Sequence, residues 1–140
     1  MITAAIVDAS VAVKWVVQET DSVQARLLST AKLEAPDLLP IECAYILWKK
    51  VRLGDLAVGQ ASSCLDLLLS SPIVLAGTGN LLDSALRIAM GLNHPIYDCV
   101  YLALALRRNV PLVTADGKLV NAVRKHRKLG IRVELLADVR

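Results

Sequence analysis

Hydrophobic positions along the chain fall into short continuous apolar runs and longer runs in which apolar residues recur every three or four positions. The short runs are typical of buried strands and lie at residues 3–7, 33–36, 72–75, 111–115 and 131–136. The second of these is short enough to be a connector instead. The longer runs predict helices at residues 11–18, 22–32, 38–54, 56–71, 80–91, 94–108 and 117–128. Strands separated by helices throughout predict a three-layer α/β/α sandwich with a mostly parallel sheet.

Capping residues support several of these boundaries. Ser10 is a suitable N-cap for the first helix, and Asp37 for the long third helix, which Gly54 closes. Pro40 is compatible with that helix because it falls in the first turn, where its missing N–H would have no partner.

The length of 140 residues fits one domain, residues 1–140, with a sizeable core. Hydrophobic residues make up 55% of the chain, yet no apolar run reaches the roughly 18 residues of a membrane span. Asp8 interrupts the first apolar segment and no basic leader precedes it, so we do not expect a signal peptide. A hydrophobic content this high in a short chain favours strands that are covered on both faces. It also favours an interface through which the protein associates with itself. We expect a cytoplasmic protein that self-associates into an oligomer.

The cysteines and the net charge exclude few functions. Cys43, Cys64 and Cys99 are far apart and show no metal-type spacing, which favours small buried hydrophobes in a reducing compartment. The formal net charge of +3 permits a nucleic-acid partner without requiring one.

Four carboxylates stand at positions where a parallel sheet could gather them. Asp8 follows the first strand and Asp116 follows the strand at 111–115. Because ligand sites lie at the carboxyl ends of parallel strands, these two acids meet if their strands are neighbours. Asp98 lies in the first turns of the helix that leads into the second of these strands. Glu42 lies in the first turns of the helix at 38–54, and we expect that helix to reach the same edge.

Each acid also has a simpler interpretation. Asp8 and Asp116 could cap the helices that follow them, and Glu42 and Asp98 could complement helix dipoles. Apolar residues follow both Glu42 and Asp98, however, and an unpaired buried carboxylate costs several kcal/mol. No basic residue is placed in the sequence to pair with either. Four carboxylates around one or two hard cations such as Mg²⁺ or Mn²⁺ would explain all of them, and such a site suits phosphodiester hydrolysis.

Four segments strengthen that hypothesis when they are taken together. They are IVDASVAVKW at 6–15, APDLLPIECAYILW at 35–48, YDCVYLALA at 97–105 and PLVTADGKL at 111–119. In order and spacing they resemble PIN-domain proteins, and specifically the VapC-type ribonuclease toxins of type II toxin–antitoxin pairs. Each segment alone is a weak signal, but the set is specific and covers essentially the whole chain.

The resemblance implies a metal-dependent endoribonuclease on a parallel sheet of about five strands. It also implies a dimer whose active site is covered by the tail of a small antitoxin, through which alone it would contact operator DNA. Carried over by position, Asp8, Glu42, Asp98 and Asp116 form the acidic quartet, with Ser10 and Thr114 as supporting hydroxyls. Many relatives have Asn three residues after the helix glutamate, where this chain has Tyr45.

The roles that follow from this resemblance are distinct. Asp8 and Asp98 are the expected principal ligands of Mg²⁺ or Mn²⁺, and Asp116 binds directly or through water. Glu42 is a ligand or the base that orients the attacking water. Cleavage of RNA by water should leave 5′-phosphate and 3′-hydroxyl ends.

Several cationic and aromatic residues are candidates for contacts with RNA. The cations that could contact RNA are Lys14, Lys49, Lys50, Arg52 and the run at 124–128, although the run also fits a solvated helix end. Trp15, Tyr45 and Trp48 could stack on bases, but their helical spacing and apolar flanks favour packing in the core or in a dimer. We assign no catalytic role to His94 or His126.

Two other functions remain open at this stage. One is an aspartyl phosphatase or phospho-acceptor domain, which an acid after the first strand could also serve. Against it, no second Asp follows two residues after Asp8, and no glycine-rich phosphate loop is present. The other is a catalytically silent PIN-fold binding module, against which the complete set of four acids argues.

Overall fold

Five short strands form one sheet in the computed structural model, which describes residues 1–140. The strands are β1 (Ala4–Val7), β2 (Lys32–Pro36), β3 (Val74–Ala76), β4 (Leu112–Thr114) and β5 (Val133–Leu135). Their order is β3-β2-β1-β4-β5 and every neighbouring pair is parallel. The segment at 33–36 is therefore an inner strand and not a connector. Connections run outward on both sides of β1, so the topology switches direction between β1 and β4.

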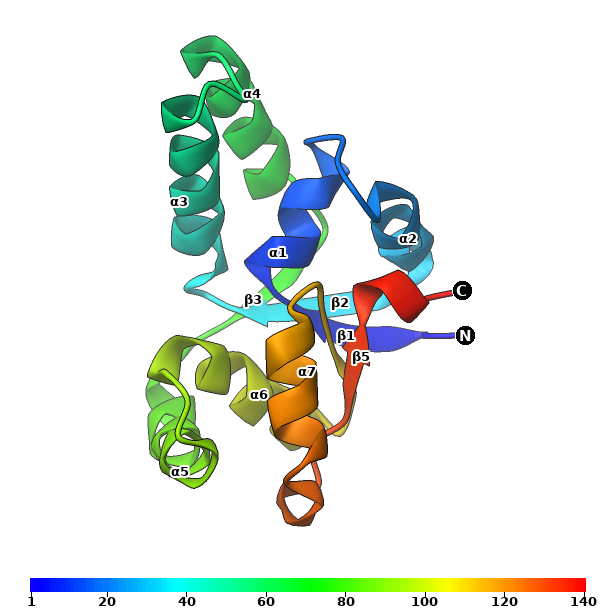
Figure 1. The fold of residues 1–140 in the computed structure, drawn as a ribbon, viewed down its shortest axis with the longest axis vertical. Helices are drawn as coiled ribbons and strands as arrows, with labels where there is room; N and C mark the ends of the chain where they lie inside the picture. The colour runs from blue at the N-terminus through cyan, green and yellow to red at the C-terminus, as the bar shows by residue number, and fades with distance from the viewer.

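Helices cover both faces of the sheet, which confirms the predicted three layers (Figure 1). One face carries α1 (Ala9–Ala12) and α2 (Ser22–Leu27), and the other carries α5 (Leu82–Leu92), α6 (Ile96–Arg108) and α7 (Gly117–Arg124). Every residue of α6 from 99 to 105 is buried. A helix that is apolar all round belongs inside the protein, and this one lies between the sheet and α5.

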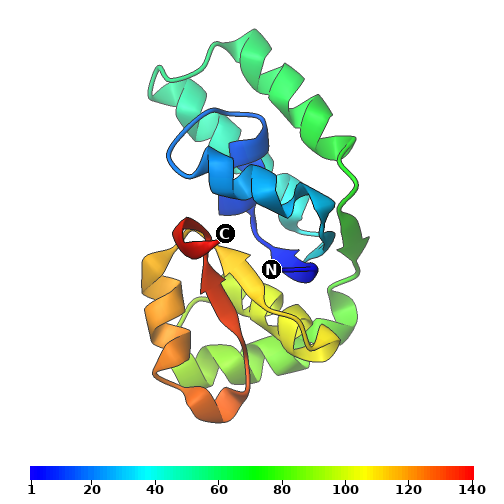
Figure 2. The ribbon, with the colours of Figure 1, turned by 90° about the vertical axis from the view of Figure 1, so that its right-hand side faces the viewer.

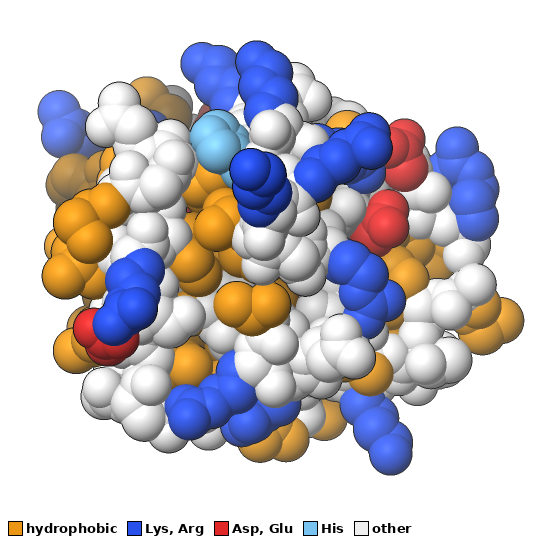
Figure 3. All heavy atoms as spheres, turned by 90° about the horizontal axis from the view of Figure 1, so that it is seen from below, with side chains coloured by type: hydrophobic (Ala, Val, Ile, Leu, Met, Phe, Trp, Pro, Cys, Tyr) orange, Lys and Arg blue, Asp and Glu red, His pale blue; other side chains and the backbone are white.

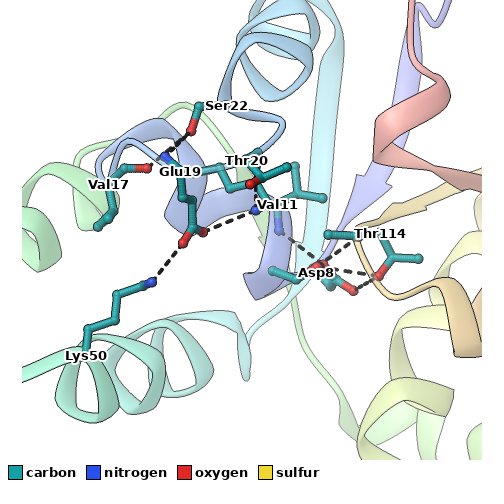
Figure 4. Close-up of polar contacts among 11 residues, drawn as sticks. Asp8, Val11, Val17, Glu19, Thr20, Ser22, Lys50 and Thr114 are labelled. Carbon is teal, nitrogen blue, oxygen red and sulfur yellow. Dashed lines mark hydrogen bonds and ion pairs between the residues drawn. The ribbon is translucent and has the colours of Figure 1, made fainter. Parts of the chain in front are cut away.

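Two further helices extend beyond the sheet as a hairpin (Figures 1 and 2). They are α3 (Leu39–Arg52) and α4 (Val58–Leu69), and we call residues 39–69 the α3–α4 arm. Three residues of α3 at four-residue spacing are buried, namely Leu39, Cys43 and Leu47, whereas no residue of α4 is buried. An ion pair of 2.8 Å between Lys50 Nζ and Glu19 Oε2 ties α3 to the loop after the first helix (Figure 4).

The start of the chain differs from the prediction. The expected helix at 11–18 with Ser10 as its N-cap is wrong, because α1 is a single turn capped by Asp8, whose carboxylate accepts a hydrogen bond from the Val11 N–H. A 3-10 turn, η1 (Val13–Trp15), follows it. The Trp15 indole N–H donates to the Ala25 carbonyl at 2.6 Å, so the chain after η1 packs against α2 instead of continuing as a helix.

Other helix ends are also shorter than predicted. The α2 helix passes into a 3-10 turn, η2 (Leu28–Thr30), because Lys32 already pairs with β1. Leu38, and not Asp37, is the N-cap residue of α3. The α7 helix ends at Arg124, and the basic run beyond it forms a separate 3-10 turn, η4 (Arg127–Leu129).

Two smaller predictions can be checked against the fold. None of the helices combines the length and the apolar character needed to cross a membrane. All three cysteines are free thiols; Cys43 and Cys99 are buried as predicted, while Cys64 is only half-buried. Burial raises the pKa of Cys43 to about 12 and that of Cys99 to about 11, so neither thiol is a nucleophile near neutral pH.

Candidate active site

Asp8 is the most firmly held carboxylate of the predicted set. It follows β1, is 8% exposed, and accepts hydrogen bonds from the Ser10 hydroxyl on Oδ1 and the Thr114 hydroxyl on Oδ2, each at 2.5 Å (Figure 4). Ser10 Oγ in turn accepts from the Ala115 N–H at 3.0 Å, and Thr114 Oγ1 accepts from the Asp116 N–H at 3.1 Å. These bonds join the carboxyl ends of β1 and β4 and place the hydroxyls of Ser10 and Thr114 against the Asp8 carboxylate.

The surroundings of Asp8 disfavour its charge. Burial raises the pKa of Asp8 from 3.8 to about 6, and the negative charge of Asp98 adds to the effect. The hydrogen bonds from Ser10 and Thr114 lower the pKa but do not cancel the effect of burial. A cation beside this carboxylate would remove the penalty.

Asp98 and Glu42 come from helices on different sides of the cleft. Asp98 lies in the first turn of α6 with its side chain 35% exposed, and its Oδ2 lies 2.7 Å from His94 Nε2. Glu42 lies in the first turn of α3 and is half-buried. Burial raises the pKa of Glu42, the charge of Asp98 raises it further, and the nearby Tyr101 hydroxyl lowers it in part. Glu42 and Asp98 therefore lie within each other's electrostatic field.

Asp116 is the exposed member of the set. It is the N-cap of α7, where its Oδ1 accepts from the N–H groups of Lys118 at 3.0 Å and Leu119 at 3.2 Å. Asp8 caps α1 as well, so the simpler capping interpretation holds for both residues. Capping leaves Asp116 Oδ2 free, and each carboxylate oxygen has two lone pairs, so neither cap prevents binding of a cation.

One open cleft of about 580 Å³ collects all four carboxylates. Its lining also contains Ser10 and Ala9 from α1, Tyr97 from α6, and three residues of α3, which are Ile41, Tyr45 and Ile46. Thr114 lies behind Asp8, and no lysine or arginine is part of the lining. The helix bearing Glu42 thus reaches the switch point between β1 and β4, and the carboxylates meet there with His94, beside Asp98, as the basic side chain in contact with the set.

Two residues of this region were not identified from the sequence. His94 forms the short contact with Asp98 although we expected no basic partner there; their four-residue spacing was the available signal. Tyr101 is 1% exposed and its hydroxyl is the one buried side-chain polar atom without a hydrogen-bond partner. That hydroxyl lies near Glu42, but no hydrogen bond of standard geometry joins them. Burial, and then Glu42, raises the pKa of Tyr101, so it stays protonated.

The two α3 aromatics differ from the prediction as well. Tyr45 is 59% exposed and Trp48 is 52% exposed, so neither ring packs in the core, while packing in a dimer stays a prediction. The helix instead turns the face carrying Leu39, Cys43 and Leu47 toward the core.

The chemistry of the cleft can be compared with what different metals need. No three His, Cys, Asp or Glu side chains are arranged as a ready-made cage for one ion, which argues against a closed zinc-type site. Mg²⁺ keeps several waters and is commonly held by one or two carboxylates together with substrate phosphates. An open cleft with only oxygen ligands among its charged groups, and with an unpartnered hydroxyl close by, fits a hydrated hard cation.

Comparison with known proteins adds independent information. The family model described as "PIN domain" matches residues 5–125. Ribonuclease VapC3 from Pyrobaculum aerophilum is 34% identical over 118 residues, which cover 81% of this chain and 90% of that protein.

Two solved structures share the fold. The crystal structure of PAE2754 from Pyrobaculum aerophilum is 25% identical with a TM-score of 0.68, covering 92% of this chain and 90% of the other. That of VapBC2 from Rickettsia felis, bound to a DNA fragment from its promoter, is 16% identical with a TM-score of 0.66, covering 94% and 98%. The second likeness bears on the fold alone.

Proposed function

The chain belongs to the PIN-domain family, and on that basis we propose that it is the toxin of a toxin–antitoxin pair, a VapC-type endoribonuclease that needs a divalent metal ion. The observation that carries the proposal is the cleft in which four carboxylates meet without a lysine or arginine. The identity of 34% to Ribonuclease VapC3 supports RNA as the substrate. Residues 1–140 then act as a single PIN-like domain.

Each residue of the cleft has a defined part in this proposal. Asp8 and Asp98 are the principal ligands of Mg²⁺ or Mn²⁺, and Asp116 binds directly or through water. Ser10 and Thr114 hold the carboxylate of Asp8 in one orientation, so that its position does not depend on the ion. The bound ion would supply an activated water and neutralise charge on the attacked and departing oxygens of the phosphodiester.

Glu42 has the properties of a proton acceptor for that water. Its raised pKa brings it closer to neutral pH than an ordinary glutamate, and it faces Asp98 across the cleft. The alternative role for Glu42 is a further metal ligand. In either role, water attacks phosphorus and the products carry 5′-phosphate and 3′-hydroxyl ends.

The proposed partners follow from the same family. A small antitoxin would silence the enzyme by covering the acidic cleft, and operator DNA would be contacted only through that antitoxin. We place the pair in the cytoplasm, where RNA substrates are present.

A surface for a homodimer is offered by exposed apolar residues on α5, which lie at four-residue spacing: Leu82, Leu86 and Met90. Hydrophobic side chains gather on the left of the face in Figure 3, the side on which α5 lies in Figure 1.

Cleavage of a defined pool of single-stranded RNAs tests the proposal, with and without Mg²⁺ or Mn²⁺. We expect metal-dependent cleavage, and a loss of at least about 100-fold in Asp98→Asn because one principal ligand is gone. Asp83→Asn is the matched control, since Asp83 is an exposed acid on the outer helix α5, paired only with Arg87. Full activity of folded Asp98→Asn, with contaminating nuclease excluded, would contradict the assignment.

A further inference from the structure

An aromatic stripe with a cation at its end runs along the exposed face of α3. It consists of Tyr45, Trp48 and Arg52, whose spacing of three and four residues places them on one side of the helix. The ring centroids of Tyr45 and Trp48 lie 5.7 Å apart with a tilt of 32°. The guanidinium carbon of Arg52 lies 5.5 Å from the Trp48 ring centroid. We call these three residues the α3 stripe.

The α3 stripe begins inside the acidic cleft. Tyr45 is part of the cleft lining and follows Glu42 by three residues, which is one helical turn. Tyr97, 65% exposed, belongs to the same lining beside Asp98. From the carboxylates outward along α3, the surface therefore changes from acidic to aromatic and then to basic.

We propose that the α3 stripe binds single-stranded RNA beside the scissile phosphate, with bases stacked on Tyr45 and Trp48 and a phosphate held by Arg52. This inference rests on the proposed ribonuclease function. Aromatic side chains stack on any base, so the stripe would give affinity without strict sequence preference. A duplex keeps its bases stacked inside and cannot offer their faces, so single-stranded RNA is the substrate that this surface selects.

The spacing of the stripe suits successive nucleotides. The ring centroids of Tyr45 and Trp48 lie 5.7 Å apart, which is more than the roughly 3.4 Å between stacked bases of one strand. The two rings therefore match neighbouring bases of an extended strand, in which the bases are no longer stacked on each other.

Charge favours RNA over a protein on this face. Lys49 and Arg52 have no acidic partner within the chain, whereas neighbouring Lys50 is paired with Glu19. Free cations that follow exposed aromatic rings match a phosphate backbone that carries bases. A second copy of the chain or a partner protein could also use Tyr, Trp and Arg as anchors, so these occupants are outcomes that the experiment must separate.

Steady-state kinetics give the first test. Tyr45→Ala and Trp48→Ala should each raise KM for a single-stranded RNA by roughly 5- to 150-fold, the range of one base-stacking contact, with a smaller change in kcat. Tyr45→Phe keeps the ring and should stay near wild type. Leu27→Ala is the control, because Leu27 is about equally exposed, at 51%, on α2, which contributes no residue to the cleft lining. Unchanged KM in both alanine variants would overturn the inference about the α3 stripe. The ribonuclease proposal would still stand in that case, provided that the wild type cleaves RNA.

A substrate lacking one base makes the test specific for stacking. In an oligonucleotide with a mapped cleavage site, an abasic nucleotide beside the cut should weaken wild-type cleavage about as much as Tyr45→Ala does. If ring and base contact each other, the abasic substrate and the variant together should be little worse than either alone. The stacking contact would be rejected if, at every abasic position near the cut, the loss caused by the missing base and the loss caused by the variant simply multiply. This outcome would have to hold for both Tyr45→Ala and Trp48→Ala.

Two further readouts separate the remaining outcomes. Fluorescence anisotropy of a labelled single-stranded oligonucleotide reports binding without cleavage, so the stripe can be tested even if the wild type cuts nothing. Light scattering reports the oligomeric state. Loss of self-association in Trp48→Ala, with RNA affinity unchanged, would assign the stripe to a second copy and overturn the RNA inference.

Discussion

The two sides of the acidic cleft are built in different ways. On one side, Asp8 is buried at the junction of β1 and β4 and accepts hydrogen bonds from Ser10, Thr114 and the Val11 N–H. On the other side, Glu42 and Tyr45 belong to the α3–α4 arm, whose second helix has no buried residue. The comparison teaches that the chain embeds one carboxylate in its core and places the opposite wall of the cleft on a peripheral hairpin.

That difference divides the tasks of the site. A buried, hydrogen-bonded carboxylate keeps one position and one environment, which suits a metal ligand. The α3 helix packs on the core along one side only. Its other side is exposed, which suits contacts with a long and variable substrate. On this account, metal affinity depends mainly on Asp8 at this junction and on Asp98 of α6, and RNA affinity mainly on the arm.

The largest expected effect contrasts packing in the two regions. Leu102→Ala, in the buried helix α6, should lower the free energy of unfolding by about 2–5 kcal/mol because it leaves a cavity. Leu65→Ala, on half-buried α4, should cost about 1 kcal/mol because its side chain already contacts solvent. Urea unfolding measures both values. Equal costs would mean that the arm is as firmly packed as the core.

The charge of Asp8 should make the metal-free protein less stable as pH rises. Its folded pKa of about 6 lies above its ordinary value of 3.8, so between these values the folded state holds a proton that the unfolded chain has released. Below about pH 4 the Asp8 carboxyl is protonated in both states and carries no burial penalty. As pH rises through about 6, the free energy of unfolding falls by about 3 kcal/mol.

Asp8→Asn isolates this contribution from those of the other acids. The difference in unfolding free energy between the variant and wild type should grow in favour of the variant from about pH 4 to about pH 7. Adding Mn²⁺ at neutral pH should stabilise wild type more than the variant. A difference that does not change with pH would show that Asp8 is ionised as readily in the folded state as in the unfolded chain.

Thr114→Val tests the hydrogen bonds at the Asp8 junction. The substitution keeps the shape of a fully buried side chain but removes the donor to Asp8 and the acceptor for the Asp116 N–H. We expect a loss of about 1–3 kcal/mol in the free energy of unfolding. Thr30→Val, at an exposed 3-10 turn, is the control and should stay within about 0.5 kcal/mol. Equal effects would mean that the junction is not held by these bonds.

The smallest effect concerns a basic region remote from both sides of the cleft. Residues 124–128 lie at the end of α7 and in η4, opposite the end that Asp116 caps, and Lys and Arg side chains are prominent on the face in Figure 3. We expect less than about a twofold change in KM for RNA when Lys125 and Lys128 become Gln, because their phosphate contacts would lie away from the cut. A larger change with a flatter salt dependence would extend the RNA path to this face.

The sequence allowed the sheet and the positions of Asp8 and Asp116 to be predicted because both depend on local patterns, whereas grouping Glu42 and Asp98 with them rested on their apolar neighbours and on the family resemblance. Short apolar runs between helices define parallel strands, and an acid directly after a buried strand falls at the carboxyl edge of the sheet. The end of the first helix was not predictable, because the contact of Trp15 with the Ala25 carbonyl is tertiary. Exposure of Tyr45 and Trp48 was missed for a related reason: α3 has apolar residues on both sides, and only the fold decides which side packs.

The most direct test of the account is a titration of Mn²⁺, followed by calorimetry or by the electron paramagnetic resonance of the free ion. Wild type at neutral pH should show saturable binding, and both Asp8→Asn and Asp98→Asn should bind at least about 10-fold more weakly, while the control Asp83→Asn binds like wild type. If folded Asp8→Asn and Asp98→Asn both bind Mn²⁺ as tightly as wild type, the four acids do not form a shared metal site and the central claim is wrong.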